Sequence, residues 1–279
     1  MNTTATVSVS EITRLRHITG AGMMDCKKAL TEAGGDIDKA IEILRKKGQK
    51  IAANRSGHEA KEGIVLAKIS TDGKKGVLVS VNCETDFVAR NQEFCDYVSA
   101  ITEIAVTELP DTIDKLKSFP LRNEGVSVED KLNELLAKIG EKMFISHCEI
   151  ISAEYVVAYN HPGNKLASIV GFNKKVLDEV ARNIAMQVAA MAPIAVDKED
   201  VESSVIEREM EIGRELARKE GKPENVLEKI ALGKLNKFYQ EVTLLNQDFI
   251  RENKKTVRQY LSETDKELSV TGFKRIALG

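Results

Sequence analysis

Residues 63–83 read GIVLAKISTDGKKGVLVSVNC, and this stretch decides the kind of fold. Short runs of β-branched and other apolar residues stand on both sides of the turn Thr71-Asp72-Gly73. Two such runs joined by a turn that contains Asp-Gly are a typical signal for a β-hairpin. We therefore predict two antiparallel strands, over residues 63–69 and 76–83.

The same order of elements occurs again later in the chain. After the first hairpin, residues 92–108 carry apolar side chains at helical spacing. Residues 154–172 give a second hairpin around the turn His161-Pro162-Gly163-Asn164, and residues 175–191 give a second helix. We infer an α+β fold whose core has two similar subdomains, each a small antiparallel sheet covered by helices.

A later strand candidate completes each half, at residues 143–151 in the first and 268–278 in the second. Between the halves, residues 109–140 are mostly helical after Val126. The apolar face of that helix carries Leu132, Leu135, Leu136 and Ile139.

Upstream of the first hairpin, residues 9–47 predict three short helices. The turns Thr19-Gly20-Ala21-Gly22 and Gly34-Gly35 separate them, and Asp36 is placed to cap the third. We expect Gly48 to close the third helix. Three helices of this length resemble a ubiquitin-associated-type bundle.

Residues 48–62, GQKIAANRSGHEAKE, show no periodicity and are rich in small and charged residues. We predict a linker that acts as a solvated tether. The alternative is that its basic residues Lys50, Arg55 and Lys61 contact an acidic partner.

Residues 197–240 interrupt the second half with a helical hairpin. The segment Gly221-Lys222-Pro223 stops one helix and starts the next. Both helices have narrow apolar stripes, which we expect to pack against each other: Val201, Val205, Ile212 and Leu216 on one, and Val226, Ile230, Leu235, Phe238 and Val242 on the other. The pattern leaves two possibilities open: a helical hairpin that only projects into solvent, and an arm for self-association.

Composition limits the function further. Lys and Arg total 41 against 43 Asp and Glu, a near-neutral balance that argues against direct nucleic-acid binding. The four cysteines, Cys26, Cys83, Cys95 and Cys148, are scattered, which indicates separate thiols in a reducing compartment. No apolar run reaches the ~20 residues of a membrane helix, and the N-terminus lacks a signal-peptide pattern. We expect a cytoplasmic protein with no membrane, metal or cofactor partner.

No catalytic motif is present either. A phosphate-binding loop is missing, and the four histidines are far apart in the sequence. The segment that stands out is residues 82–91, NCETDFVARN, which leaves a strand and enters a helix. Thr85 or Asp86 can cap that helix. Phe87 is either a core residue or an exposed aromatic that anchors in a partner's pocket.

Two long motifs resemble the elongation factor Ts family. The first runs from Thr19 to Leu30, TGAGMMDCKKAL, and the second is residues 82–91. Further similar segments follow in the order expected for the family: Asn183-Ile184-Ala185-Met186, Ala189-Ala190-Met191 and Val270-Thr271-Gly272-Phe273. The similarity extends over the chain from about Val9 onward.

The resemblance implies a guanine-nucleotide exchange factor without a catalytic site of its own. Its partner would be elongation factor Tu, both GDP-bound and nucleotide-free. In the family, the corner that matches Thr85, Asp86, Phe87 and Val88 enters the nucleotide domain of Tu and dislodges its magnesium ion. Residue matching implies further contacts with Tu at Arg16, Met23, Met24, Ile139, Gly140 and His161.

The resemblance also implies self-association, as a homodimer through residues 197–240. Several members continue into a further helical module that contacts Tu. Because this sequence ends at Leu278-Gly279, we do not carry that contact over.

The expected division has five segments. They are residues 1–55, the ubiquitin-associated-like domain with linker; 56–152, the first core subdomain; 153–196 and 241–279, the two parts of the second; and 197–240, the inserted arm. Two rival functions stay open at this point. One is a nucleic-acid-binding helical domain with an oligomerisation arm that uses the basic linker. The other is an enzyme that acts on a small molecule with His161 or Cys83 as a general base or nucleophile.

Overall fold

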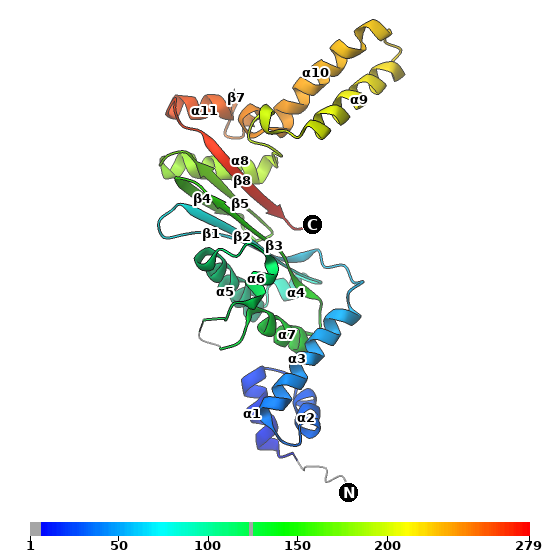
Figure 1. Cartoon of the computed structure of the whole chain (residues 1–279), viewed down its shortest axis with the longest axis vertical. Helices are drawn as coiled ribbons and strands as arrows, with labels where there is room; N and C mark the ends of the chain where they lie inside the picture. Colours follow the sequence, from blue (N-terminus) through cyan, green and yellow to red (C-terminus); the bar gives the residue numbers. More distant parts are fainter. Residues whose placement is uncertain (1–6, 123–124) are drawn as a thin grey trace.

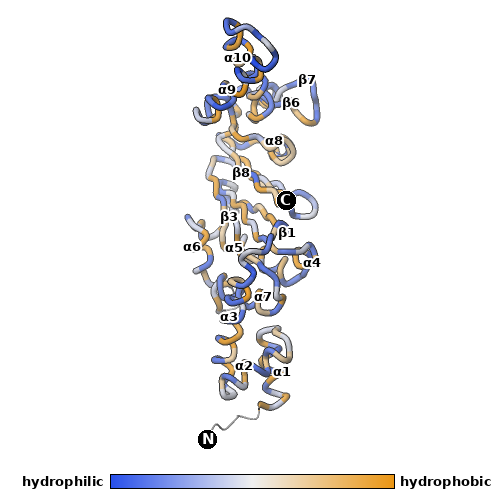
Figure 2. Tube along the Cα trace, turned by 90° about the vertical axis from the view of Figure 1, so that its right-hand side faces the viewer, coloured by the Kyte–Doolittle hydropathy of each residue, from blue (hydrophilic) through white to orange (hydrophobic). Residues whose placement is uncertain are grey.

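The structure is a computed structural model that describes residues 7–122 and 125–279. Its parts follow one another along a single long axis (Figure 1). A three-helix unit lies at the N-terminal end, two small sheets with their helices form the middle, and a helical hairpin projects at the far end. The perpendicular view gives the same order (Figure 2). The fold is α+β, as the sequence predicts.

The three-helix unit consists of α1 (Val9–Thr19), α2 (Met23–Glu32) and α3 (Ile37–Asn54). Ser8 caps α1 together with Glu11, and Gly20 ends the helix with a positive φ of 65°. The buried side chains form one small core: Ile12, Leu15, Ala21, Cys26, Ala29, Leu30, Ala40 and Leu44.

The predicted end of α3 at Gly48 is wrong, because the helix continues to Asn54. Gly48 is buried inside α3, where the helix crosses α7 (Val128–Ile139). A Cβ atom on Gly48 would lie only 2.8 Å from the carbonyl carbon of Asn133. The glycine therefore permits a close helix crossing, and the predicted tether is shorter than residues 48–62.

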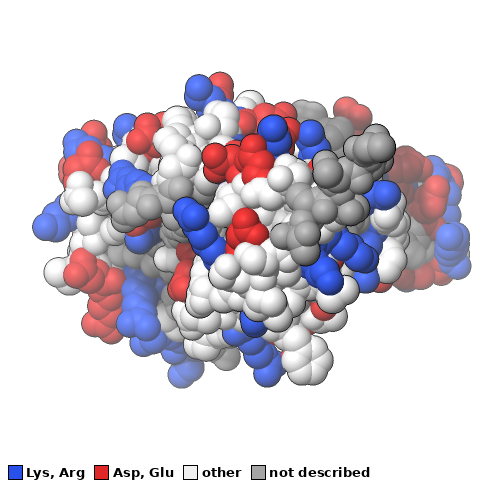
Figure 3. Space-filling model, turned by 90° about the horizontal axis from the view of Figure 1, so that it is seen from below, with Lys and Arg blue, Asp and Glu red and all other residues white. Residues whose placement is uncertain are grey.

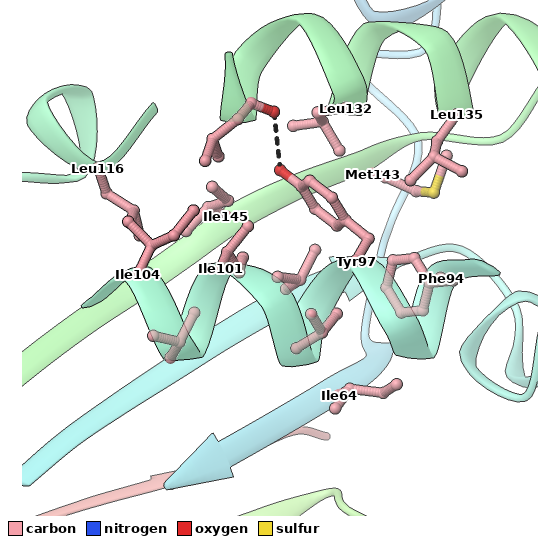
Figure 4. Packing of buried hydrophobic residues seen from close by; sticks show 14 of the residues in the cluster. Ile64, Phe94, Tyr97, Ile101, Ile104, Leu116, Leu132, Leu135, Met143 and Ile145 are labelled. Atoms are coloured by element: carbon pink, nitrogen blue, oxygen red, sulfur yellow. Dashed lines mark hydrogen bonds between the residues drawn. The ribbon is translucent and has the colours of Figure 1, made fainter. Parts of the chain in front are cut away.

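The first half of the core has the sheet order β1-β2-β3, with β1 (Glu62–Ile69), β2 (Lys75–Cys83) and β3 (Met143–Ser152) all antiparallel. On one face lie the helices α4 (Asp86–Ala89), α5 (Gln92–Glu108), α6 (Ile113–Ser118) and α7. Figure 4 shows their shared core, in which the hydroxyl of Tyr97 on α5 donates to the carbonyl oxygen of Val128 at 3.2 Å.

The second half repeats this topology. Its sheet order is β4-β5-β8, from β4 (Tyr155–Asn160), β5 (Leu166–Phe172) and β8 (Val270–Ala277), covered by α8 (Asp178–Met191). In both halves a hairpin comes first, and the last strand joins its second strand. The predicted internal repeat is thus confirmed, although α8 begins three residues later than Lys175.

The two sheets pack face to face. Side chains from both meet between them: Val65, Ala67 and Leu78 from the first, and Ala167, Ile169 and Ile276 from the second. The approach is close at Gly76, where a Cβ atom would lie 2.7 Å from Cγ1 of Val156. The core is therefore four layers, with two sheets inside and helices outside.

The inserted arm consists of α9 (Ser203–Lys219) and α10 (Glu224–Val242). The predicted inward stripe on α9 is wrong, since Ile212 and Leu216 are exposed. Small residues bring the two helices together instead, and a Cβ atom on Gly213 would lie 3.0 Å from the Cα atom of Ala231. The buried side chains of the arm are Met210, Ala217, Leu227, Ala231 and Leu235.

After the arm, the sequence patterns missed a two-stranded sheet, β6 (Asp248–Phe249) with β7 (Glu252–Thr256), and the helix α11 (Val257–Thr264). Two 3₁₀ turns flank the arm, at Lys198–Asp200 and Leu244–Asn246. Within the described part of the chain, none of the helices is long and apolar enough to cross a membrane. The five-segment division stays a prediction, and its residues 1–6 and 123–124 lie outside the described residues.

Candidate partner-binding site

The corner between β2 and α5 presents one aromatic ring to solvent. Thr85 has extended backbone and caps the short helix α4 by accepting the N–H of Val88. Phe87 on that helix is 82% exposed, whereas Val88 is 5% exposed and belongs to the main core. The corner thus directs Phe87 outward and anchors itself through Val88. Of the two cap candidates, Thr85 fills the position.

Polar contacts fix this corner. The Thr85 hydroxyl donates to the carboxylate of Glu141, 3.0 Å from Oε2. The Cys83 thiol donates to the Thr85 carbonyl oxygen at 3.2 Å. Asp86 pairs with Arg90 one helical turn later, at 3.0 Å. The backbone around Phe87 is therefore held while its ring remains free.

Glu84 forms the base of the corner. Nη1 of Arg55 donates to its carboxylate, 2.9 Å from Oε1 and 2.7 Å from Oε2, and Nδ1 of His58 lies 3.1 Å from Oε2. The backbone N–H of Lys142 donates to it at 2.6 Å. Burial raises the pKa of Glu84, but the N–H of Lys142 and the side chains of Arg55 and His58 outweigh burial and lower the pKa to about 2.

The predicted contacts in the three-helix unit are exposed. Met23 is 49% and Met24 is 65% exposed at the start of α2, and Arg16 is exposed near the end of α1. The opposite face of α2 is buried through Cys26, Ala29 and Leu30. Met23 and Met24 are therefore free of the unit's own core.

The end of α7 connects the unit with the corner. Gly140 closes α7 with a positive φ of 80°, next to the half-buried Ile139. The two residues that follow, Glu141 and Lys142, bind Thr85 and Glu84. On the other side, Gly20 of the α1–α2 turn lies against the Lys138 side chain. Ile139 and Gly140 thus lie between the corner and the three-helix unit.

His161 lies in the turn between β4 and β5. It is exposed, and its Nδ1 lies 2.9 Å from the Tyr159 hydroxyl. Lys165, just after this turn, pairs with Glu62 at 2.6 Å, and Glu62 is opposite Cys83 in the sheet. The turn and the corner are therefore at the same end of the stacked sheets.

The charge pattern fits a protein partner. Seen from the N-terminal end, Lys and Arg alternate with Asp and Glu around an uncharged area (Figure 3).

In residues 7–122 and 125–279, no three His, Cys, Asp or Glu side chains are grouped so that they could hold a metal ion. Burial, with the carboxylates of Glu141 and Glu62, raises the pKa of Cys83 to about 12, so its thiol is a poor nucleophile near neutral pH.

The sequence leaves Phe87 open between a core and an exposed position, and the other exposed candidates come from the family resemblance; the residues that hold the corner are not predicted as such. Glu84, Glu141 and Lys142 read as ordinary surface charges in the sequence. Arg55 is a candidate contact to an acidic partner there, and in the structure it binds Glu84 of the same chain. The contacts of these four residues join residues 29 to 58 positions apart, for which a single sequence carries no local signal.

Comparison with known proteins identifies the family. The family model described as "Elongation factor TS" matches residues 84–279, beginning at the corner. The chain belongs to the elongation factor Ts family. It is 49% identical to elongation factor Ts of Amoebophilus asiaticus over 276 residues, which is 98% of this chain and 99% of the relative. It is 48% identical to that of Cytophaga hutchinsonii over 277 residues, 98% and 99% of the two chains.

The relative from Porphyromonas gingivalis is 46% identical over 272 residues, 98% of each chain. The match therefore includes the three-helix unit, the core and the arm. Members of this family are translation elongation factors that act as nucleotide-exchange factors, so the chain is a factor of that kind. The resemblance found in the sequence motifs is confirmed.

Proposed function

We propose that this protein binds elongation factor Tu with GDP bound and speeds GDP release by displacing the magnesium ion. The observation that carries the proposal is Phe87, an aromatic side chain that is 82% exposed on a corner with a fixed backbone. An exposed aromatic on a rigid element is well suited to anchor in a partner's pocket. Asp86 and Thr85 shape the corner, and Val88 holds it from inside.

Nucleotide exchange of this kind needs no covalent chemistry. If the factor weakens GDP binding by some ratio, GDP must weaken factor binding by the same ratio. The factor must therefore bind the nucleotide-free state more tightly, which a wedge inserted near the nucleotide achieves. Magnesium and the diphosphate of GDP attract each other strongly, so loss of the ion lowers the affinity of Tu for GDP.

The other candidate contacts extend this surface in the proposal. Arg16, Met23 and Met24 bind the nucleotide domain of Tu through the three-helix unit. Ile139, Gly140 and His161 bind a second domain from the core. The arm, residues 197–240, joins two copies of the chain, and exposed Ile212, Leu216 and Leu232 support that role. The protein acts in the cytoplasm, without a cofactor.

The test is a GDP-release assay. Elongation factor Tu loaded with a fluorescent GDP analogue is mixed with excess unlabelled GDP, with and without this protein. We expect release to speed up with protein concentration and to saturate. An unchanged release rate at saturating protein concentration, with binding to Tu shown separately, would contradict the proposed function.

A further inference from the structure

α3 runs without a break from the three-helix unit to the base of the corner. With 18 residues it spans about 27 Å, at 1.5 Å per residue. Ala40 and Leu44 lie in the core of the unit, and Gly48 lies against the backbone of α7. Arg45 adds two contacts to α7, 3.0 Å to Glu134 and 3.8 Å to Asp130. The unit and α7 are thus joined along the middle of α3.

Glu84, Arg55, His58 and Lys142 form what we call the Glu84 clamp. Arg55 directly follows α3, and its guanidinium holds both carboxylate oxygens of Glu84. Lys142 binds Glu84 through its backbone N–H. Its ammonium donates to the carbonyl oxygens of Ser56 and His58, at 2.6 and 3.0 Å. The chain that leaves α3 is therefore held between the corner and the turn after α7.

The low exposure of Glu84, at the centre of the clamp, strengthens its contacts. The Glu84 side chain is 13% exposed and that of Arg55 is 35% exposed. Charge-assisted hydrogen bonds with little access to water are stronger and more directional than those between solvated surface charges. The clamp thus differs from the exposed ion pairs elsewhere on the molecule, such as Lys74 with Glu154.

We propose that Glu84 is a positioning residue: through the clamp it fixes the Phe87 corner against the end of α3, so that α3 acts as a rigid spacer between the three-helix unit and the corner. When the three-helix unit binds elongation factor Tu, the corner already has the position from which Phe87 can insert. Fixed geometry removes the entropy that a mobile corner would lose on insertion. The inference rests on the proposed function, since it assumes that the corner is the wedge.

A mobile connection predicts a different behaviour. If residues 48–62 were a flexible linker, the root-mean-square distance between its two ends would be about 20 Å. A flexible coil of n residues has an end-to-end distance of roughly 5–6 Å times the square root of n. The three-helix unit would then bind Tu independently of the corner. Loss of Arg55 or Glu84 would in that case leave both binding and GDP release unchanged.

The experiment separates binding from release. Glu84→Ala, Arg55→Ala and the double variant are compared with the parent chain on Tu loaded with fluorescent GDP. We expect unchanged affinity for Tu with GDP, which the three-helix unit and the α7 end provide. We expect the release rate at saturating factor to fall about fivefold or more, because the corner no longer enters pre-positioned. The double variant should be no slower than the worse single variant, because both remove one clamp.

Two further variants sharpen the result. Arg55→Lys keeps the charge and should recover part of the release rate. Lys74→Ala with Glu154→Ala removes an exposed ion pair, 2.9 Å in length, and should leave every parameter unchanged. A lower melting temperature in the clamp variants with an unchanged saturating release rate would overturn the positioning role.

Amide hydrogen exchange tests the clamp without Tu. The N–H of Lys142, which donates to Glu84, should be protected in the parent chain and should exchange about tenfold faster or more in Glu84→Ala. An unprotected Lys142 amide in the parent would overturn the clamp itself. If the parent chain does not accelerate GDP release while the amide is protected, the clamp stands as structure and the proposed function has failed.

Discussion

The hydroxyl of Thr85 lies 3.1 and 3.0 Å from the two carboxylate oxygens of Glu141, a residue 56 positions later in the chain. The same hydroxyl oxygen accepts the backbone N–H of Val88 at 3.4 Å. The helix cap at the corner is therefore tied to the turn that follows α7. The backbone that carries Phe87 is set by long-range contacts, while the ring itself contributes little to the core.

This arrangement predicts that Phe87→Ala leaves the fold intact. The ring is 82% exposed, so its removal forfeits little buried surface. If Phe87 anchors in a pocket of Tu, its loss should cost ~2–4 kcal/mol at the interface, roughly a 30- to 1000-fold effect. We expect a near-native melting temperature and GDP release from Tu slowed at least about tenfold.

Phe94→Ala is the matched control, seven residues later in the same region. Phe94 is fully buried in the main core, where large-to-small changes cost ~3–5 kcal/mol. It should lower stability in urea unfolding, and any loss of exchange should follow the loss of folded protein. A well-folded Phe87→Ala protein with full exchange activity would remove the wedge from the mechanism.

The crossing of α3 and α7 predicts opposite effects for two glycines. Gly48→Ala places a Cβ atom 2.8 Å from the Asn133 carbonyl carbon, so the helices must move apart, at ~1–3 kcal/mol. Gly233→Ala in α10 meets no atom within 4 Å and should stabilise the helix by ~0.5–1 kcal/mol. Urea unfolding measures both. Equal effects at the two positions would mean that the close crossing is absent in solution.

Much of this fold can be predicted from local patterns. The two hairpins, the repeat and the three N-terminal helices each show as spacing or turn residues within ten to twenty positions. Gly48 shows why the prediction fails elsewhere. A glycine near the end of an apolar stripe indicates a helix stop, whereas here the approach of α7 explains why a glycine stands inside the helix.

The residues of the candidate site also fall into those that the sequence indicated and those that it did not. Phe87 stands out because it lies where a strand passes into a helix, although the pattern leaves a buried and an exposed position both open. Met23 is implied by the family resemblance. Glu84 gives no such signal, and Arg55 is considered only as a contact to another protein. Their pairing at 2.7 Å depends on how α3 packs on α7. On α9, the pattern marked Ile212 and Leu216 as inward. The structure turns them outward because Gly213 and Ala231 allow a closer helix contact on another face.

The exposed apolar residues of the arm predict self-association. Ile212, Leu216 and Leu232 are 42%, 43% and 49% exposed, outside the contact between α9 and α10. Ile212→Lys together with Leu216→Lys should weaken a dimer and leave the melting temperature nearly unchanged. Sedimentation equilibrium over a concentration series measures this. A parent chain that stays monomeric throughout, or a variant of unchanged mass, would contradict the dimer. The matched variant is Arg208→Ala, an exposed residue of α9 that is not apolar.

Substitution of the exposed residues Met23 and Arg16 in the three-helix unit should weaken binding to Tu without lowering stability. Met23 and Arg16 are exposed and lie outside the unit's core, so Met23→Ala with Arg16→Ala should leave unfolding almost unchanged. If both contact Tu, affinity should fall by ~1–3 kcal/mol, roughly 5- to 150-fold. Titration calorimetry against Tu measures it. Cys26→Ser, at a fully buried position of α2, is the control that should lower stability. A large shift in unfolding with intact affinity would place Met23 and Arg16 in the fold and not in the interface.

The lowered pKa of Glu84 predicts how stability changes with acid. Its folded pKa is about 2, against roughly 4.3 for an unfolded glutamate. A depressed carboxyl pKa stabilises the folded state above the unfolded pKa, and that contribution is lost as the pH falls toward the folded pKa. Glu84→Gln lacks the contribution at every pH. The free energy of unfolding should therefore differ between parent and variant by a constant amount above about pH 5.5, and the difference should shrink from about pH 4.3 downward. Urea unfolding of the parent and of Glu84→Gln at four pH values measures it. A difference still undiminished at about pH 3 would mean that the Glu84 carboxylate does not supply this stability.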